Sequence, residues 1–201
     1  MAHGLEWVRR RRAIPAMALL AVLLSAPAYA HVAGGAVGGF LSGVAHPLFG
    51  YDHLLAMLAV GIWGAQMGGR AVWTLPVTFP LIMAVGGILG MAGVPLPSVE
   101  LGIALSVLVL GLSIAFAWRP FEPIALLIVA AFAIFHGYAH GAELPAAADP
   151  IAYSIGFVAA TGGIHVTGIA IGLLIGRLYE GRVSRGLGGA IAAGGLYFLW
   201  T

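Results

Sequence analysis

The sequence contains no cysteine and no lysine, and only 8% of its 201 residues are formally charged. Without cysteine it can form no disulfide, no thiolate metal site and no cysteine nucleophile. Without lysine it has no Walker A motif for ATP hydrolysis and cannot form a Schiff base. A soluble domain is typically about 25% charged, so these side chains are too few to cover a water-soluble surface. Hydrophobic residues make up 61% of the chain, and lipid is therefore the expected solvent.

The beginning of the chain has the pattern of a secretory signal peptide. Arginines occupy positions 9–12, an apolar run follows from 13 to 24, and Ala28 and Ala30 form an A-x-A site. We expect residues 1–30 to be a cleavable signal peptide and residues 31–201 to form the mature domain. An uncleaved first helix is the alternative. Cleavage would make His31 the mature N-terminus, where its amine and imidazole could capture a metal ion together. Because the arginine run at 9–12 belongs to the signal peptide, it gives no indication of a nucleic-acid partner.

Six mostly apolar segments of the mature chain are candidates for transmembrane helices. They are residues 49–67, 72–94, 99–118, 123–141, 151–176 and 187–200. A glycine-rich segment, 34–45, precedes the first of them, and Pro47 and Gly50 predict a break or kink between the two. Because the loops are only a few residues long, we expect an all-α polytopic membrane protein, a compact bundle of six transmembrane helices.

The arginines outside the signal peptide predict the orientation of this bundle. They follow the first, third and fifth segments, as Arg70, Arg119, Arg177, Arg182 and Arg185. Alternate loops lie on the same side of a membrane, and arginine-rich loops are usually cytoplasmic. We therefore expect both ends of the mature chain in the periplasm and the protein in the bacterial inner membrane.

Histidines and carboxylates are concentrated at three places in these apolar segments, where ionisable residues are costly and usually functional. The candidates are His46, Asp52 and His53, then His136, His140 and Glu143, and finally His165. The second group shares one helix face. The first helix begins and the fourth ends on the periplasmic side, so the first two groups should lie at the same depth. The pattern predicts a shallow metal site with one deeper histidine beneath it.

These donors leave several kinds of site open. Imidazole and carboxylate without thiolate suit Ni²⁺, Co²⁺, Zn²⁺ or Mn²⁺ better than Cu⁺. A metal-dependent hydrolase inside the membrane is one alternative, since three histidines can hold a metal that activates water. The absence of an H-E-x-x-H motif and of a G-x-S-x-G motif counts against a hydrolase, and we predict no catalytic residue. A haem-binding bundle is another alternative, which Asp52 fits poorly. His165, taken alone, fits a purely structural role as well as it fits a functional one.

The motifs resemble those of the HupE/UreJ family of nickel permeases. The likeness is carried by His46-x5-Asp52-His53, by Phe135-His136-Gly-x-Ala-His140-Gly-x-Glu143, and by Gly156-Phe157-x3-Thr161-x3-His165. The signal peptide and the six helices are similar as well. The resemblance implies import of Ni²⁺ into the cytoplasm for hydrogenase or urease maturation, with Co²⁺ suspected for some relatives. The metal is then a substrate and no cofactor is implied. The sequence indicates neither an energy-coupling partner nor an oligomeric state.

Overall fold

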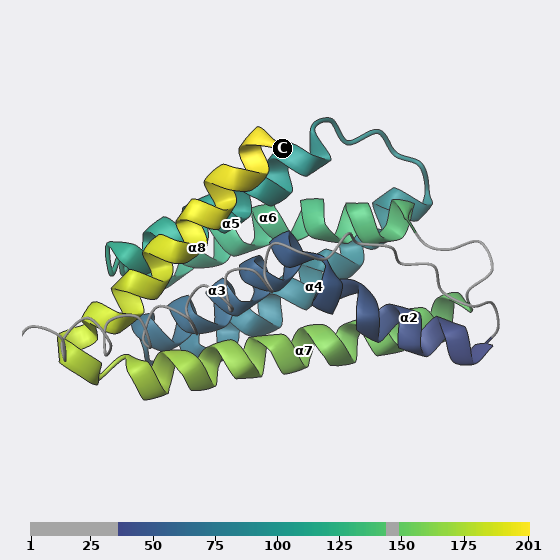
Figure 1. Cartoon of the computed structure of the whole chain (residues 1–201). Helices are drawn as coiled ribbons and strands as arrows, with labels where there is room; N and C mark the ends of the chain where they lie inside the picture. The colour runs from purple at the N-terminus through teal and green to yellow at the C-terminus, as the bar shows by residue number, and fades with distance from the viewer. Residues whose placement is uncertain (1–35, 144–148) are drawn as a thin grey trace, which may run out of the picture. The chain divides into compact units, whose positions relative to one another are not determined.

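The computed structural model describes residues 36–143 and 149–201, and this part of the chain is helical with short connections (Figure 1). The predicted signal peptide, 1–30, and His31 lie outside the described residues, so both remain predictions.

The described residues form seven α-helices and one short 3-10 helix. In chain order they are α2 (Ala36–Phe49), α3 (Tyr51–Met67), α4 (Ala71–Met91), α5 (Val99–Ala115), α6 (Glu122–Ala142), α7 (Pro150–Ile175), η1 (Leu178–Gly181) and α8 (Arg182–Trp200). Each of the six predicted segments contains a helix. The helices α4 and α5 end at Met91 and Ala115, three residues before the predicted limits, and the last helix begins at Arg182 rather than Leu187. The all-α fold class is therefore confirmed.

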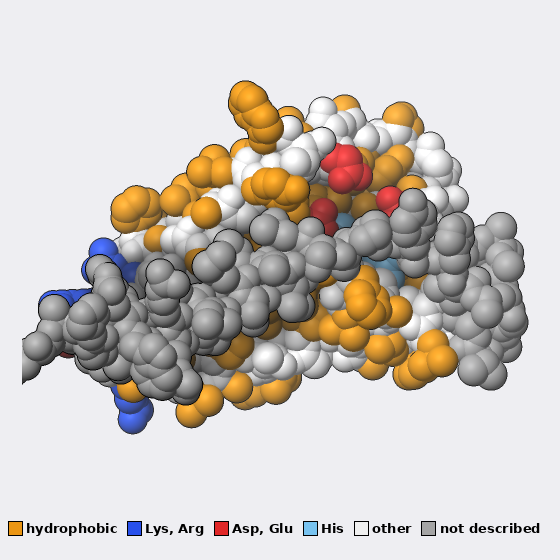
Figure 2. All heavy atoms as spheres, viewed as in Figure 1, with side chains coloured by type: hydrophobic (Ala, Val, Ile, Leu, Met, Phe, Trp, Pro, Cys, Tyr) orange, Lys and Arg blue, Asp and Glu red, His pale blue; other side chains and the backbone are white. Residues whose placement is uncertain are grey.

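Three of these helices, α4, α6 and α7, are long and apolar enough to cross a membrane. The bent pair α2 and α3 counts as a fourth span if its two parts are taken together, and α5 is apolar but shorter, at 17 residues. Six crossings therefore remain a prediction for the described residues. Large apolar side chains on the outside support a lipid environment, for example Leu81, Leu127 and Leu174, which are 64%, 70% and 74% exposed. Figure 2 shows many such side chains on the face in view.

The chain bends by 77° between α2 and α3, at Gly50. Pro47 lies in the last turn of α2, and Gly50 is the extended residue before α3. The break expected from these two residues is confirmed. Both helices of the pair pack against α7, and α3 also contacts α4 and α5. The bend therefore places the last turn of α2 and the first turn of α3 beside each other and next to α7.

Glycines bring α4 and α6 into close contact along their length. A Cβ atom on Gly137 would collide with the backbone carbonyl oxygen of Met83, and one on Gly141 would collide with that of Gly87. Gly86 and Gly90 meet the backbone of α6 in the same way. Small residues four apart let membrane helices approach closely. This packing fixes the rotation of α6, and with it the direction of the histidines beside Gly137 and Gly141.

At the end of the helices opposite the bend between α2 and α3, hydrogen bonds connect neighbouring helices. The Trp63 indole donates to the carbonyl oxygen of Trp118 at 2.8 Å, and Arg185 Nε donates to that of Ala115 at 2.9 Å. These bonds join the end of α3, the end of α5 and the start of α8. Arginine side chains gather at this end of the helices in Figure 2, away from the group of acidic and histidine side chains. The side of the membrane that the arginines face stays a prediction.

Candidate functional site

Four of the predicted histidines meet where α2, α3 and α6 come together. His46 is in the last turn of α2, His53 is in the first turn of α3, and His136 and His140 are near the end of α6. The ring centroids of His46 and His140 are 4.6 Å apart, those of His140 and His53 are 4.4 Å apart, and those of His53 and His136 are 4.7 Å apart. The two motifs, distant in sequence, therefore form one continuous row of imidazole rings, which we call the histidine row.

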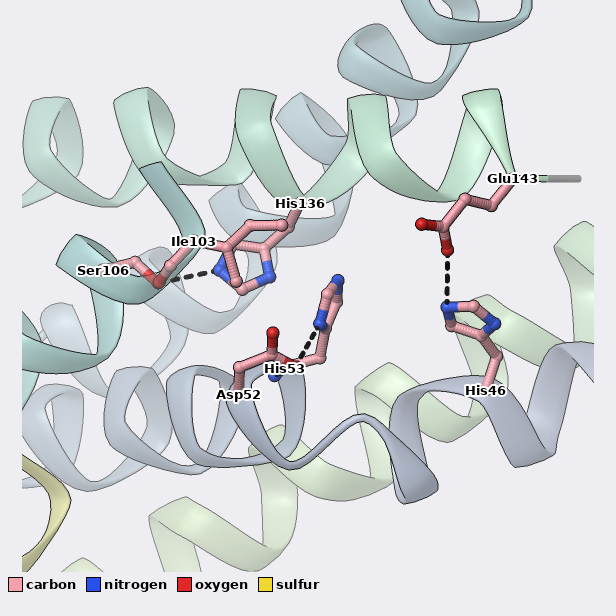
Figure 3. Close-up of polar contacts among 7 residues, drawn as sticks. All are labelled: His46, Asp52, His53, Ile103, Ser106, His136 and Glu143. Carbon is pink, nitrogen blue, oxygen red and sulfur yellow. Dashed lines mark hydrogen bonds and ion pairs between the residues drawn. The ribbon is translucent and has the colours of Figure 1, made fainter. Parts of the chain in front are cut away.

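Two carboxylates lie beside this row (Figure 3). Asp52 Oδ1 is 2.7 Å from His53 Nδ1 and also accepts the backbone N–H of His53. Glu143 Oε2 is 3.7 Å from His46 Nε2. An ionised carboxylate can only accept hydrogen bonds, so Asp52 fixes the proton of His53 on Nδ1. The lone pair of His53 then lies on Nε2, which is buried and has no partner in the part of the chain that the structure describes.

Ser106 of α5 contacts one ring nitrogen of His136 and favours one tautomer of that ring. The Ser106 hydroxyl lies 2.6 Å from the carbonyl oxygen of Ile103, to which it donates, and 2.8 Å from His136 Nε2 (Figure 3). A hydroxyl has one proton, so with that proton on Ile103 it accepts a hydrogen bond from His136 Nε2–H. The lone pair of His136 is then on Nδ1, which is buried and has no partner among residues 36–143 and 149–201. Such partners commonly orient metal-binding histidines.

The remaining ring of the row is that of His140. Both ring nitrogens of His140 are buried and unpartnered among the described residues, and the face of the ring packs against Phe157 at 4.2 Å between centroids. Burying a polar atom without a hydrogen bond is costly, so native proteins usually give such atoms a partner or a role. Three neighbouring histidines thus have lone pairs suited to a divalent metal ion.

Exposure decreases from the outer end of the site to its inner end, although His140, at 5% as a whole residue, is slightly more buried than His53, at 7%. The side chain of Glu143 is 57% exposed, that of His46 27% and that of His53 9%, while His136 is fully buried. Glu143 lies just beyond the end of α6, and partial burial raises the pKa of its carboxyl group because the charged form loses hydration. The exposed carboxylate therefore marks the entrance to the row, and His136 marks its inner end.

The side chains of the histidine row do not form a complete coordination shell for a metal ion. Among residues 36–143 and 149–201, no three histidine or acidic side chains converge closely enough to hold a metal ion as they stand. Neighbouring rings meet edge to face, with interplanar angles of 62° to 83°. Side-chain rotation would be needed for two or three of these lone pairs to share one ion. The assignment of these residues as ligands accordingly remains a prediction.

One aromatic ring contacts both the row and His165. Phe79 of α4 lies 5.3 Å from His136 and 5.4 Å from His165 between ring centroids, and all three side chains are almost completely buried. Within the described part of the chain, both nitrogens of His165 lack a hydrogen-bond partner, as does the hydroxyl of Thr161 one turn earlier in α7. His165 thus lies near the inner end of the row, and Phe79 contacts both His136 and His165.

Sequence reasoning missed Ser106, Phe79 and Tyr153, whose ring stacks on Phe157 near His46. Ser106 and Tyr153 carry a weak signal, because each is a polar residue inside an apolar segment. Phe79 carries none, since phenylalanine is ordinary in such a segment. Met57, one turn after His53, is fully buried in the hydrophobic core, which agrees with a packing role.

Comparisons with known proteins agree with the motifs. A sequence model of the family described as "HupE / UreJ protein" matches residues 18–198. Protein HupE from Rhizobium leguminosarum bv. viciae is 45% identical over 181 residues, which cover 90% of this chain and 94% of the relative. No solved structure gives a significant match.

Proposed function

The chain belongs to the HupE/UreJ family, and from this premise we propose that it is a secondary permease that imports Ni²⁺, or the similar ion Co²⁺, through the histidine row. Membership in a family of transporters places the chain among membrane transport proteins rather than enzymes. The hydrolase alternative is therefore not favoured. In this proposal the protein lies in the inner membrane, and the imported metal supplies hydrogenase or urease maturation.

The contacts of His53 with Asp52 and of His136 with Ser106 are the observation that carries this proposal. Asp52 and Ser106 each hold one ring proton away from the row, which leaves the buried Nε2 of His53 and Nδ1 of His136 free to donate to a metal. Nitrogen and oxygen donors without sulfur match Ni²⁺ and Co²⁺. A merely structural histidine usually uses its buried ring nitrogens in hydrogen bonds.

Entry would begin at the exposed end of the row. Glu143 and His46 are the most accessible donors, and the carboxylate attracts a hydrated cation at this edge. The ion would exchange some of its water for His140 and His53, while the negative charge of Asp52 offsets part of the cost of burying a cation. Retained waters would complete the coordination.

The incomplete shell suits a transporter. A site that conducts an ion must bind it tightly enough to admit it and weakly enough to release it. A row of single donors, each 4.4 to 4.7 Å from the next between ring centroids, permits an ion to move from one histidine to its neighbour. His165, near the inner end of the row, would be the next donor on the inward path.

Uptake of radioactive nickel and cobalt tests this proposal. Cells that produce the full-length protein should accumulate ⁶³Ni²⁺ at limiting concentration faster than cells that lack it, and added Co²⁺ should compete. Zinc and manganese serve as reference competitors, because the same donor types also bind them. Equal accumulation with and without the protein, at confirmed membrane levels, would reject the transport proposal.

A further inference from the structure

A second polar feature lies at the arginine end of the helices, away from the histidine row. It is a pocket of about 380 Å³ between the ends of α3, α5 and α7 and the start of α8. Its polar lining includes Gln66, Arg119, Arg177, Glu180, Ser184 and Arg185. The proposed transport path does not use any of these residues.

The charge of this pocket favours an anion. Three arginines line it against one carboxylate, Glu180, and that carboxylate is 3.6 Å from Arg182, which is not part of the lining. Arg119 and Arg177 are exposed and have no ion-pair partner among the described residues. Guanidinium groups bind phosphate oxygens through paired hydrogen bonds. The same three charges make the pocket unfavourable for a metal cation.

Neutral hydrogen-bonding groups are available in the same pocket. The hydroxyl of Ser184 is buried, with the residue only 2% exposed, and it has no partner among the described residues. The side-chain oxygen of Gln66 is likewise unpartnered, while its amide nitrogen donates to the carbonyl oxygen of Ile114. A hydroxyl can donate to a phosphate oxygen, and an amide oxygen can accept from a hydroxyl of a headgroup.

The pocket also borders the outward-facing side of α7. Leu173 belongs to its lining and is 54% exposed, and the adjacent Leu174 is 74% exposed. A ligand in the pocket can therefore place an acyl chain along apolar side chains that face lipid. A free phosphate ion would gain nothing from this surface.

We propose that this pocket binds the phosphate headgroup of an anionic membrane lipid. Basic pockets between helices near a membrane surface are suited to such headgroups. The arginines would contact the phosphate, Ser184 and Gln66 would contact polar headgroup atoms, and the acyl chains would run beside Leu173. This site is independent of metal transport.

Native mass spectrometry of the full-length protein in detergent tests this site with phosphatidylglycerol as the probe. One phosphatidylglycerol molecule should be retained more strongly than phosphatidylcholine. Arg177→Gln removes a charged donor and should weaken phosphatidylglycerol binding about tenfold. Arg70→Gln is the matched control, because Arg70 is also exposed at a loop and its loss changes the net charge equally, but it does not line the pocket. Thermal unfolding without added lipid should be unchanged in both variants.

Three outcomes would overturn the assignment. Equal retention of phosphatidylglycerol and phosphatidylcholine would remove the need for an anionic headgroup. An equal loss in Arg70→Gln would show that general charge, rather than this pocket, governs binding. Complete displacement of phosphatidylglycerol by millimolar inorganic phosphate would identify a site for free phosphate instead.

Discussion

At the scale of single residues, the hydroxyl of Ser106 decides which nitrogen of His136 is free. Ser106→Ala removes the acceptor for Nε2–H, so the ring can rotate or change tautomer and its Nδ1 lone pair is no longer held toward the row. Loss of such a supporting partner commonly weakens metal binding 10–100-fold. We expect Ser106→Ala to weaken Ni²⁺ binding by at least about tenfold, as measured by calorimetric titration of the purified protein.

Ser113 supplies the matched control for this change. It is a second buried serine of α5, and its hydroxyl donates to the carbonyl oxygen of Val109 in its own helix and touches no histidine. Ser113→Ala should leave the Ni²⁺ affinity unchanged. Equal affinities in the two variants and the parent would mean that the tautomer of His136 does not matter for binding.

The two serines also show which residues of the site could not be predicted from the sequence. The histidines and carboxylates could be picked out because ionisable residues are rare and costly in apolar helices. Ser106 and Ser113 look alike in the sequence, because each stands among apolar residues of the same helix. Only the packing of α5 against α6 distinguishes them. Phe79 was equally hidden, since its role depends on two neighbours from other helices.

At the scale of helices, the contact between α4 and α6 controls the position of the row. Gly137→Ala would place a methyl group against the backbone of Met83, which cannot move aside as a flexible side chain can. Alanine gains about 1 kcal/mol over glycine in helix propensity, whereas overpacking costs about 1–3 kcal/mol. The cost exceeds the gain here because the obstacle is backbone. We expect a lower melting temperature in detergent and reduced nickel uptake.

Gly163→Ala in α7 is the control for this effect. A Cβ at Gly163 meets no atom within 4 Å, so only the gain in helix propensity remains. The melting temperature of this variant should be equal to or above that of the parent. If Gly137→Ala melts as high as Gly163→Ala, the close approach of α4 and α6 does not govern stability.

The helices themselves were largely predictable, and the exceptions have physical causes. Pro47 and Gly50 indicated the break between α2 and α3, because proline and glycine interrupt helical hydrogen bonding or loosen it. The start of α8 was missed because Arg182 and Arg185 lower the local hydropathy, although long arginine side chains can extend toward water from a helix end. Hydropathy marks the apolar part of a helix, and the helix here continues beyond it.

At the scale of the whole molecule, the arginine end should face the cytoplasm. Because the chain has no native cysteine, single cysteines report this orientation cleanly. A cysteine at Arg70 should be protected from an impermeant thiol reagent in intact cells, and one at Pro97, in the loop between α4 and α5, should be labelled. Labelling at position 70 with none at position 97 would reverse the orientation.

The mature chain should begin at His31. The arginine run, the apolar stretch and the site at Ala28 and Ala30 together predict removal of residues 1–30 by signal peptidase. N-terminal sequencing of the protein extracted from membranes checks this prediction. Recovery of residues 9–12 on the membrane-embedded protein would contradict cleavage and would also remove the basis for the predicted orientation.

If the histidine row carries the imported metal ion, uptake of ⁶³Ni²⁺ by cells must depend on the side chains of the row. His53→Ala, His136→Ala, His140→Ala and Glu143→Gln each remove one donor or charge from the row, and Ser113→Ala is the control. At limiting nickel and equal membrane abundance, each site variant should lose uptake about tenfold or more, while Ser113→Ala matches the parent. Uptake at the parental rate in all four site variants would contradict the account.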